Sequence, residues 1–411
     1  MRGIPLARSA ILFWLMIAAV VCAGICLRGY PDRKKTPLMV HKDWANCVEP
    51  TIDGGFIIAG VIWGMGGMRS AIYLVKTDAH GRKLWCKTLG QGDVNRGNSV
   101  QQTLDLGYIV AGTAWPKGQK HSDMVLVKTD PSGNEMWGRI YGGKWRDEAL
   151  SVRQTTDGGY IVAGLTDSSG NGNDDVSLLK TDASGNELWR RTYGGVGRDE
   201  GHSVRQTADG GYIVAGLTNS FGNMNEQVYL LKTDPQGNLL WSRTFGGEGR
   251  DAGSSVCQTL DGGYIVAGST WPLGGIYSDV CLLKTDPDGQ EIWHRTFGGR
   301  YGDHGFAVEQ TRDGGTIVAG NTWPVGRIGQ SKMLLLKTDV SGKEMWAKSF
   351  GGEGSTYGYS VCPTADGGYV VAGKMEDLDK GNDDICLIKT DDNGNLAWRM
   401  TGACPDLKIG E

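Results

Sequence analysis

Two short motifs recur seven times along this 411-residue chain at an almost constant interval. The first is a variant of D-G-G-Y-I-V-A-G, and successive copies begin 52 or 53 residues apart. The second, K-T-D-x-x-G-x-x-x-W, keeps the same interval and register. The aspartates that open the first motif are Asp53, Asp105, Asp157, Asp209, Asp261, Asp313 and Asp366. A repeat of this length indicates an array of stacked structural units, such as a propeller or a solenoid.

Each repeat contains the elements of a four-stranded sheet. In the third copy the predicted strands are Ser151–Thr155, Tyr160–Ala163, Val176–Thr181 and Glu187–Tyr193. Turns rich in aspartate and glycine separate the first strand from the second and the third from the fourth. Beyond the N-terminal segment, no stretch shows helical periodicity.

The second predicted strand is apolar without alternation, which indicates that neighbouring units cover both of its faces. Seven four-stranded units bury these faces by closing into a ring. Solenoid repeats are usually shorter, and a sandwich would not keep the period. We therefore predict an all-β fold, a seven-bladed β-propeller of four-stranded blades over residues 43–402, preceded by one N-terminal hydrophobic helix.

The N-terminal segment Ser9–Leu27 contains no charged residue and is flanked by basic residues on both sides. Its length fits a bilayer crossing, which needs roughly 17–25 apolar residues. Residues 1–28 are therefore predicted to be an uncleaved signal anchor, with a cleaved signal peptide as the alternative. Residues 29–42 are a predicted linker, and residues 403–411 a C-terminal tail. The propeller is accordingly expected to be membrane-anchored and extracytoplasmic, or secreted.

The motif K-T-D-x-x-G-x-x-x-W resembles the tryptophan-docking repeat of quinoprotein-type propellers, in which a glycine and a tryptophan four residues later lock adjacent blades together. Gly185 and Trp189 match this spacing. With its D-G-G-Y-I-V-A-G repeats, the whole chain resembles a group of exported bacterial and archaeal propeller proteins. The resemblance implies a fold and a mode of blade packing. It does not extend to a cofactor, because quinone-dependent dehydrogenases have eight blades and a vicinal cysteine pair, and this chain has neither.

No motif predicts catalysis, a metal or a cofactor. The six histidines occupy different repeat positions and form no H-x-x-x-H pair, and neither a G-x-S-x-G elbow nor a P-loop occurs. Asp391–Asn395 and Asn173–Asp175 offer oxygen ligands, but neither segment completes an EF-hand loop. Most carboxylates belong to repeated turns, where local hydrogen bonding accounts for them. The formal net charge of -4 argues against a nucleic-acid partner.

Two pairs of cysteines occupy equivalent repeat positions: Cys257 with Cys281, and Cys362 with Cys386. If the strands run outward from the axis, first- and third-strand positions lie about 9.6 Å apart. Because this exceeds the ~7 Å limit between the Cα atoms of a disulfide, we predict buried thiols. Cys404 follows the last strand and could approach Cys47 or Cys86, fastening a ring that is expected to close without a shared strand.

The repeats differ most in the loop between the second and third strands. The first, second, fifth and sixth repeats place Trp63, Trp115, Trp271 and Trp323 there, whereas the other three place polar residues. Repeats five, six, seven, one and two are consecutive around a ring, so these tryptophans are expected on one arc. An indole suits stacking on a sugar or gripping a peptide. We predict these four tryptophans to be ligand-binding residues; the alternative is that each covers a blade edge.

The same face is expected to hold Trp145, Tyr301, His304 and Tyr357. The predicted function is a non-catalytic extracytoplasmic binding or scaffold propeller with a protein or carbohydrate ligand on this face, and with the membrane as a partner of the N-terminal segment. A carbohydrate-active enzyme or lectin-like propeller is the alternative, and a quinoprotein-like redox protein is a weaker one. An enzyme would show clustered carboxylates in the loops of one blade.

Overall fold

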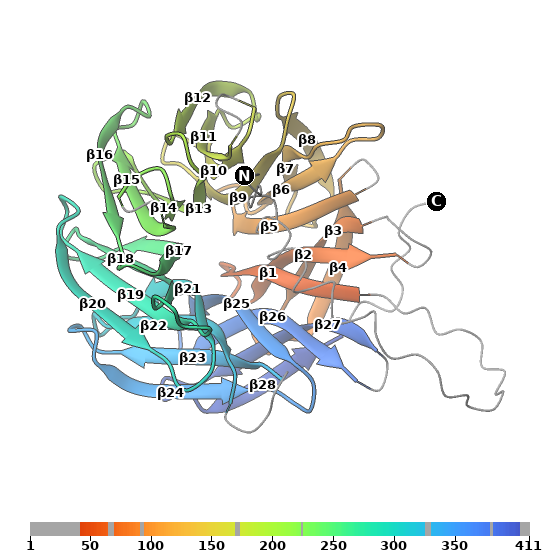
Figure 1. Ribbon diagram of the computed structural model, residues 1–411. Helices are drawn as coiled ribbons and strands as arrows, with labels where there is room; N and C mark the ends of the chain where they lie inside the picture. The colour runs from red at the N-terminus through yellow and green to blue at the C-terminus, as the bar shows by residue number, and fades with distance from the viewer. Residues whose placement is uncertain are drawn as a thin grey trace, which may run out of the picture. The chain divides into compact units, whose positions relative to one another are not determined.

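The computed structural model describes residues 42–64, 70–90, 94–168, 173–222, 225–324, 330–378 and 381–402. These residues belong to one compact unit, Val40–Glu411, and form seven four-stranded antiparallel blades arranged in a ring (Figure 1). The predicted all-β, seven-bladed propeller is therefore confirmed. Blades 1 and 2 count as one sheet only because Ser70 and Val94 form a single parallel bridge.

Blade 1 contains β1 (Lys42–Pro50), β2 (Phe56–Trp63), β3 (Ser70–Thr77) and β4 (Lys83–Leu89). Blade 2 contains β5 (Val94–Gln102), β6 (Tyr108–Trp115), β7 (Asp123–Thr129) and β8 (Glu135–Tyr141). Blade 3 contains β9 (Asp147–Gln154), β10 (Tyr160–Thr166), β11 (Asp175–Thr181) and β12 (Glu187–Tyr193). Blade 4 contains β13 (Asp199–Gln206), β14 (Tyr212–Thr218), β15 (Gln227–Thr233) and β16 (Leu239–Phe245). Blade 5 contains β17 (Arg250–Gln258), β18 (Tyr264–Trp271), β19 (Asp279–Thr285) and β20 (Glu291–Phe297). Blade 6 contains β21 (Asp303–Gln310), β22 (Thr316–Thr322), β23 (Lys332–Thr338) and β24 (Glu344–Phe350). Blade 7 contains β25 (Thr356–Pro363), β26 (Tyr369–Asp377), β27 (Asn382–Thr390) and β28 (Leu396–Thr401).

The first strand of each blade is the innermost. First strands of neighbouring blades contact one another all around the ring, and the remaining strands follow outward in chain order. The prediction for the third repeat is accurate for the fourth strand, β12. It is too short for β9, which begins at Asp147 rather than Ser151, and for β10, which continues to Thr166. Asp147 and Thr166 are paired, so the two strands extend together beyond the apolar motif.

A β-bulge interrupts the first strand of every blade. In blade 3 the register shifts opposite Ala163 and Gly164, which leaves Leu150 without a paired residue. A Cβ on Gly164 would lie 1.8 Å from the carbonyl oxygen of Glu148, so only glycine permits this close approach. Bulges redirect side chains. The equivalent unpaired residues are Asn46, Asn98, His202, Ser254, Phe306 and Tyr359.

The two repeated motifs meet within each blade. The buried Lys180 of K-T-D lies 2.9 Å from the Asp157 carboxylate of D-G-G. Its Nζ also donates to the carbonyl of Thr181 at 2.9 Å, while Asp157 accepts from the backbone of Gly159 at 3.0 Å. The same ion pair links Lys76–Asp53, Lys128–Asp105, Lys232–Asp209, Lys284–Asp261, Lys337–Asp313 and Lys389–Asp366. These carboxylates are thus structural, as their repetition predicted.

The repeated tryptophans pack against the following blade. Trp189 of blade 3 lies 5.9 Å from Tyr212 of blade 4, measured between ring centroids. A Cβ on Gly237 of blade 4 would come within 2.8 Å of the same indole. Each motif glycine therefore contacts the tryptophan of the preceding blade: Gly185 contacts Trp137, and Gly81 contacts Trp398 across the closure of the ring.

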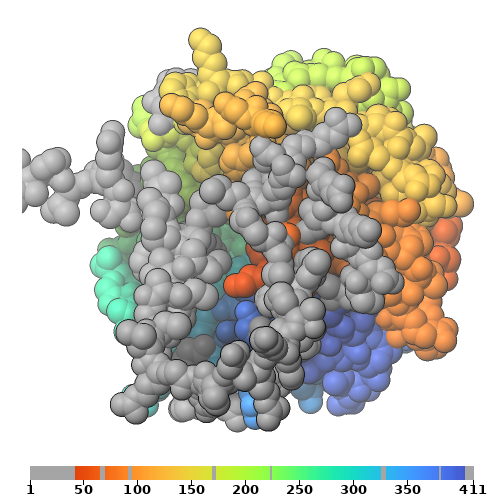
Figure 2. All heavy atoms as spheres, turned by 90° about the vertical axis from the view of Figure 1, so that its right-hand side faces the viewer, coloured from red at the N-terminus to blue at the C-terminus, as the bar shows by residue number. Residues whose placement is uncertain are grey.

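Blade 1 and blade 7 meet without exchanging a strand, as predicted (Figure 2, red to orange beside blue). Hydrogen bonds join β1 to blade 7: the Val48 amide donates to Ser360 Oγ of β25 at 3.1 Å, and the Ile385 amide of β27 donates to Asp43 Oδ1 at 2.9 Å. One hydrophobic cluster spans both blades. The side-chain packing that joins the other neighbouring blades therefore also joins the first blade to the last.

Two ion pairs bridge non-adjacent blades at the ends of the inner strands. Arg153 of blade 3 lies 2.8 Å from Glu49 of blade 1, and Arg205 of blade 4 lies 2.6 Å from Glu309 of blade 6. Each ion pair joins two blades that are separated by a third. The inner strands are therefore linked across the intervening blade. Burial lowers the pKa of Arg205, but the charges of Glu309 and Glu49 outweigh this and raise it.

Five cysteines have buried, free thiols: Cys47, Cys257, Cys281, Cys362 and Cys386. The prediction of buried thiols for the two equivalent pairs is confirmed. The suggested bond between Cys404 and Cys47 is wrong, because the Cys47 thiol is buried inside the ring, 3.7 Å from the carbonyl of Val100. Cys86 is disulfide-bonded. Its suggested partner, Cys404, lies outside the described residues.

The predicted N-terminal helix, the linker to residue 41 and the tail 403–411 also lie outside the described residues. Within the described ranges, no helix is long and apolar enough to cross a membrane.

Candidate ligand-binding face

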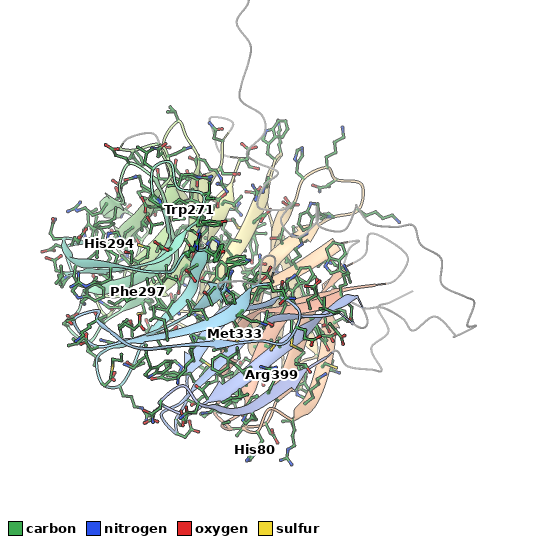
Figure 3. All side chains as sticks on the ribbon, turned by 60° about the horizontal axis from the view of Figure 1, so that its bottom comes forward. His80, Trp271, His294, Phe297, Met333 and Arg399 are labelled. Atoms are coloured by element: carbon green, nitrogen blue, oxygen red, sulfur yellow. The ribbon has the colours of Figure 1, made fainter. Side chains whose placement is uncertain are left out.

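The four tryptophans predicted to bind a ligand share one face of the ring. Three of them end second strands, at Trp63 of β2, Trp115 of β6 and Trp271 of β18, and Trp323 directly follows β22. They lie level with the beginnings of the first strands; Trp271, for example, is paired with Arg250 (Figure 3). We call this side the upper face. All four indoles are partly buried, so each packs on the protein and also presents a surface to solvent.

Trp63 and Trp115 enclose an arginine. The guanidinium carbon of Arg96, from the inner strand β5, lies 5.8 Å from the ring centroid of Trp63 and 5.3 Å from that of Trp115. Trp44 of β1 adds a third indole, 6.3 Å from Trp63. Burial lowers the pKa of Arg96, against an opposing effect from the charge of Glu148. We call these four residues the arginine cluster.

Trp271 and Trp323, which the sequence predicted to lie on one face, both contact His304. The imidazole centroid lies 5.4 Å from Trp271, 5.6 Å from Trp323 and 5.9 Å from Phe306. The aromatic contacts continue from Phe306 to Tyr359 at 5.5 Å and from Tyr359 to Tyr357 at 6.0 Å. These six residues, from blades 5 to 7, form the histidine cluster.

The histidine at the centre of this cluster is neutral at physiological pH. Burial lowers the pKa of His304 to about 4, and its Nδ1 lies 3.1 Å from Ser269 Oγ. Opposite His304 in the ladder, Asn321 is buried, and neither atom of its amide has a hydrogen-bond partner among the described residues. Buried polar groups are normally satisfied by protein or ordered water, so this amide marks a place for a water or a ligand atom.

Charged residues occupy the upper face of blades 3 to 5, between the two clusters. Two arginines each bridge two carboxylates: Arg146 lies 2.8 Å from Glu148 and 3.1 Å from Asp174, and Arg198 lies 2.5 Å from Glu200 and 3.0 Å from Glu226. Arg250 continues the chain, 2.7 Å from Glu226, and lies over Trp271 at 5.9 Å. We call these residues the ionic belt. It is continuous with the histidine cluster.

Two carboxylates of the belt have opposite pKa shifts. Burial raises the pKa of Asp174 to about 6, and the charge of Glu200 adds to this effect against Arg146. Burial also acts on Glu200, but the hydrogen bond from His202 and the arginine charges lower its pKa to about 2. His202 is 2.9 Å from Glu200, and its other nitrogen is 2.7 Å from the carbonyl of Gly253.

The sequence did not identify several of these residues. Phe306, Tyr359 and His202 occupy the bulge, a position that differs between blades within a nearly constant stretch, and this variation was the available signal. Arg96 lies two residues before it. Of the residues predicted on this face, His304 and Tyr357 belong to the histidine cluster. Trp145 is 51% exposed and contacts His121, and Tyr301 contacts Tyr277.

Across the described ranges, no three His, Cys, Asp or Glu side chains lie close enough to hold a metal ion. Asp391, one of the oxygen-rich positions, accepts hydrogen bonds from the amides of Asn393 at 3.0 Å and Asn395 at 2.7 Å. Its carboxylate therefore stabilises its own turn.

Comparison with known proteins supports the fold. No family model matches the chain. The regulatory protein FlaEY of Caulobacter vibrioides is 25% identical over 227 residues, a match that covers 46% of this chain and 24% of that protein. The chain thus spans about a quarter of the length of this relative.

Many solved structures are similar to the chain, and three of them illustrate the similarity. The WD40 domain of Neurospora crassa Pan2 has a TM-score of 0.52 at 11% identity, over 80% of this chain and 86% of that one. Sqt1 of Chaetomium thermophilum has a TM-score of 0.50 at 11% identity, over 87% and 86%. A puromycin hydrolase mutant complexed with PGG has a TM-score of 0.51 at 14% identity, over 87% of this chain and 54% of that one. At these identities the similarity shows the propeller fold alone.

Proposed function

We propose that this chain is a non-catalytic binding propeller that recognises a protein partner on its upper face, outside the cytoplasm. The observation that carries the proposal is the convergence of partly exposed tryptophans, tyrosines and an arginine on that face. Tryptophan, tyrosine and arginine are the residue types enriched at the energetic centres of protein interfaces.

The two clusters are also held in place before any ligand arrives. Trp271 and Trp323 are fixed by His304, and Trp63 and Trp115 by Arg96. Side chains that are already ordered lose little entropy on association, so more of their contact energy contributes to affinity. Packing on a blade edge and binding a ligand are therefore compatible roles for the same indole.

The extracytoplasmic location is supported by the disulfide at Cys86, because such bonds persist in oxidising compartments. The apolar segment Ser9–Leu27 supports it independently.

Selection from a phage-displayed random peptide library tests the proposal. The enriched peptide should bind at least tenfold more weakly to Trp271→Ala and to Trp323→Ala, with unchanged circular dichroism. Trp145→Ala is the matched control, since this exposed indole of the same face belongs to neither cluster, and it should bind normally. Equal affinity for all three variants would contradict the proposal.

A carbohydrate-active enzyme is the second candidate, favoured by the opposite pKa shifts of Asp174 and Glu200. These two groups could act as acid and base at a glycosidic bond. Hydrolysis of a panel of oligosaccharides that is lost in Asp174→Asn would establish it. Binding without turnover would eliminate it.

A further inference from the structure

The arginines of the upper face differ in how their charge is balanced. Arg146, Arg198 and Arg250 each lie within 3.1 Å of a carboxylate of the ionic belt. Arg96, in contrast, makes no hydrogen bond and no ion pair with any residue that the structure describes, and its Nε is buried. No carboxylate among the described residues therefore balances the charge of Arg96 directly.

The pKa shifts of Arg96 and Arg198 follow the same division. Burial lowers the pKa of Arg96, and the charge of Glu148 only partly opposes this. For Arg198, burial acts in the same sense, but the adjacent carboxylates outweigh it and raise the pKa. Among the described residues Glu148 pairs with Arg146, at 2.8 Å, and forms no ion pair with Arg96. Removing part of a cation from water without a partner is unfavourable, and an anion brought next to it offsets some of that cost.

The contacts of Arg96 with Trp63 and Trp115 leave its hydrogen-bond donors available to such an anion. The guanidinium carbon lies over both indole rings, 5.8 and 5.3 Å from their centroids. The donors of a guanidinium lie in its plane and match the two oxygens of a carboxylate. These contacts with the indoles hold the group in place and leave its hydrogen-bond donors unused by the described residues.

A purely structural role is the main alternative, since a cation over an indole stabilises the protein by itself. Such pairs occur elsewhere in the molecule: Arg191 lies over Trp189 at 5.8 Å, and Arg295 over Trp293 at 5.6 Å. Those arginines lie on outermost strands, over one ring each. Arg96 lies between two rings on the innermost strand, among the residues of the proposed ligand face.

We infer that Arg96 is the anion-recognising residue of the upper face and that the protein partner presents a carboxylate to it. This inference rests on the proposed function and names the chemistry of the partner. An acidic peptide segment is favoured over an acidic glycan because the arginine and the tryptophans around it have the composition of a protein-interface hot spot.

The test uses the peptide enriched from the phage library, synthesised in its acidic form and with each carboxylate replaced in turn by the amide. Isothermal titration calorimetry on the wild-type protein should show that one such replacement weakens binding at least tenfold. On Arg96→Gln the acidic and amide forms should bind equally. Arg295→Gln is the matched control, a stacked arginine remote from the face, and should keep the wild-type difference.

Arg96→Lys keeps the charge but removes the planar pair of donors, so it should recover only part of the difference. Tryptophan fluorescence and thermal unfolding confirm that each variant is folded. The inference is overturned if no amide replacement weakens binding to the wild type, or if the difference persists in Arg96→Gln. It is also overturned if trigalacturonate binds in an Arg96-dependent manner while no peptide does. Enriched peptides that need Trp271 and Trp323 but no carboxylate would remove this inference and leave the proposed function standing.

Discussion

Blade 3 offers two turn glycines with similar backbone conformation but different surroundings, and alanine at each position measures the docking of the blades. Gly158 and Gly185 both have positive φ, +83° and +77°. An alanine forced to adopt positive φ lowers the free energy of unfolding by about 1–2 kcal/mol. Because alanine also reduces the entropy of the unfolded chain, about 0.4–1 kcal/mol of this loss is offset. Nothing lies within 4 Å of a Cβ at Gly158, so Gly158→Ala should show only this net backbone effect.

At Gly185 the added Cβ would lie 2.8 Å from two carbons of the Trp137 indole and 3.1 Å from Cγ of Arg139. The indole also packs on Tyr160 at 6.0 Å, so it cannot move away freely. Overpacking of this kind typically costs about 1–3 kcal/mol. Gly185→Ala should therefore reduce the free energy of unfolding by about 1–3 kcal/mol more than Gly158→Ala does.

Guanidinium unfolding followed by circular dichroism and by tryptophan fluorescence measures the difference. The comparison requires that both probes give the same transition for each variant. Equal losses at the two positions would refute the assignment of the glycine–tryptophan contact as the lock between blades.

Three further predictions concern stability and location. Burial alone would raise the pKa of Asp53, Asp209 and Asp261, but the hydrogen bonds from threonine, lysine and glycine lower it to about 2. The resulting stabilisation of the fold is present above the unfolded pKa near 4 and is lost as the pH falls towards 2. Asp209→Asn should therefore make the free energy of unfolding depend less steeply on pH in the acid range. Glu309→Ala should cost about 1–3 kcal/mol because it removes the hydrogen-bonded partner of the partly buried Arg205, and Arg205→Met in the same chain should recover much of the loss in thermal unfolding; no recovery would show that the pair matters through packing alone. The full chain should fractionate with membranes and a chain beginning at Arg28 should be soluble, whereas recovery from cells of a mature soluble protein that lacks Met1–Ala23 would favour a cleaved signal.

The sequence predicted the blades well because the repeats carry local information. Asp157-Gly158-Gly159 and the K-T-D turn form their own hydrogen bonds, so each blade could be recognised in isolation. The extent of β9 was missed because its first residues, from Asp147, lack the apolar pattern and are ordered by pairing with β10. The ion pairs Arg153–Glu49 and Arg205–Glu309 join residues more than a hundred positions apart, which no local pattern indicates.

The candidate site was only partly predictable for the same reason. The four tryptophans were visible as breaks in the repeat, and His304 and Tyr357 were placed on the correct face. Which of them meet depends on the closure of the ring and on the bulge, which brings Phe306 against Tyr359 of the next blade. That Arg96 has no carboxylate partner among the described residues is evident only from the structure, in which the other charged residues of the upper face pair with one another.

The central claim, that the upper face binds the partner through its tryptophans, is tested most directly by fluorine NMR. With 5-fluorotryptophan incorporated and each resonance assigned by a tryptophan-to-phenylalanine variant, titration with the enriched peptide should shift the signals of Trp63, Trp115, Trp271 and Trp323. The docking residues Trp137 and Trp189 provide the internal reference, and their signals should stay in place. Shifts at the docking tryptophans, with the four upper-face signals unchanged, would contradict the account.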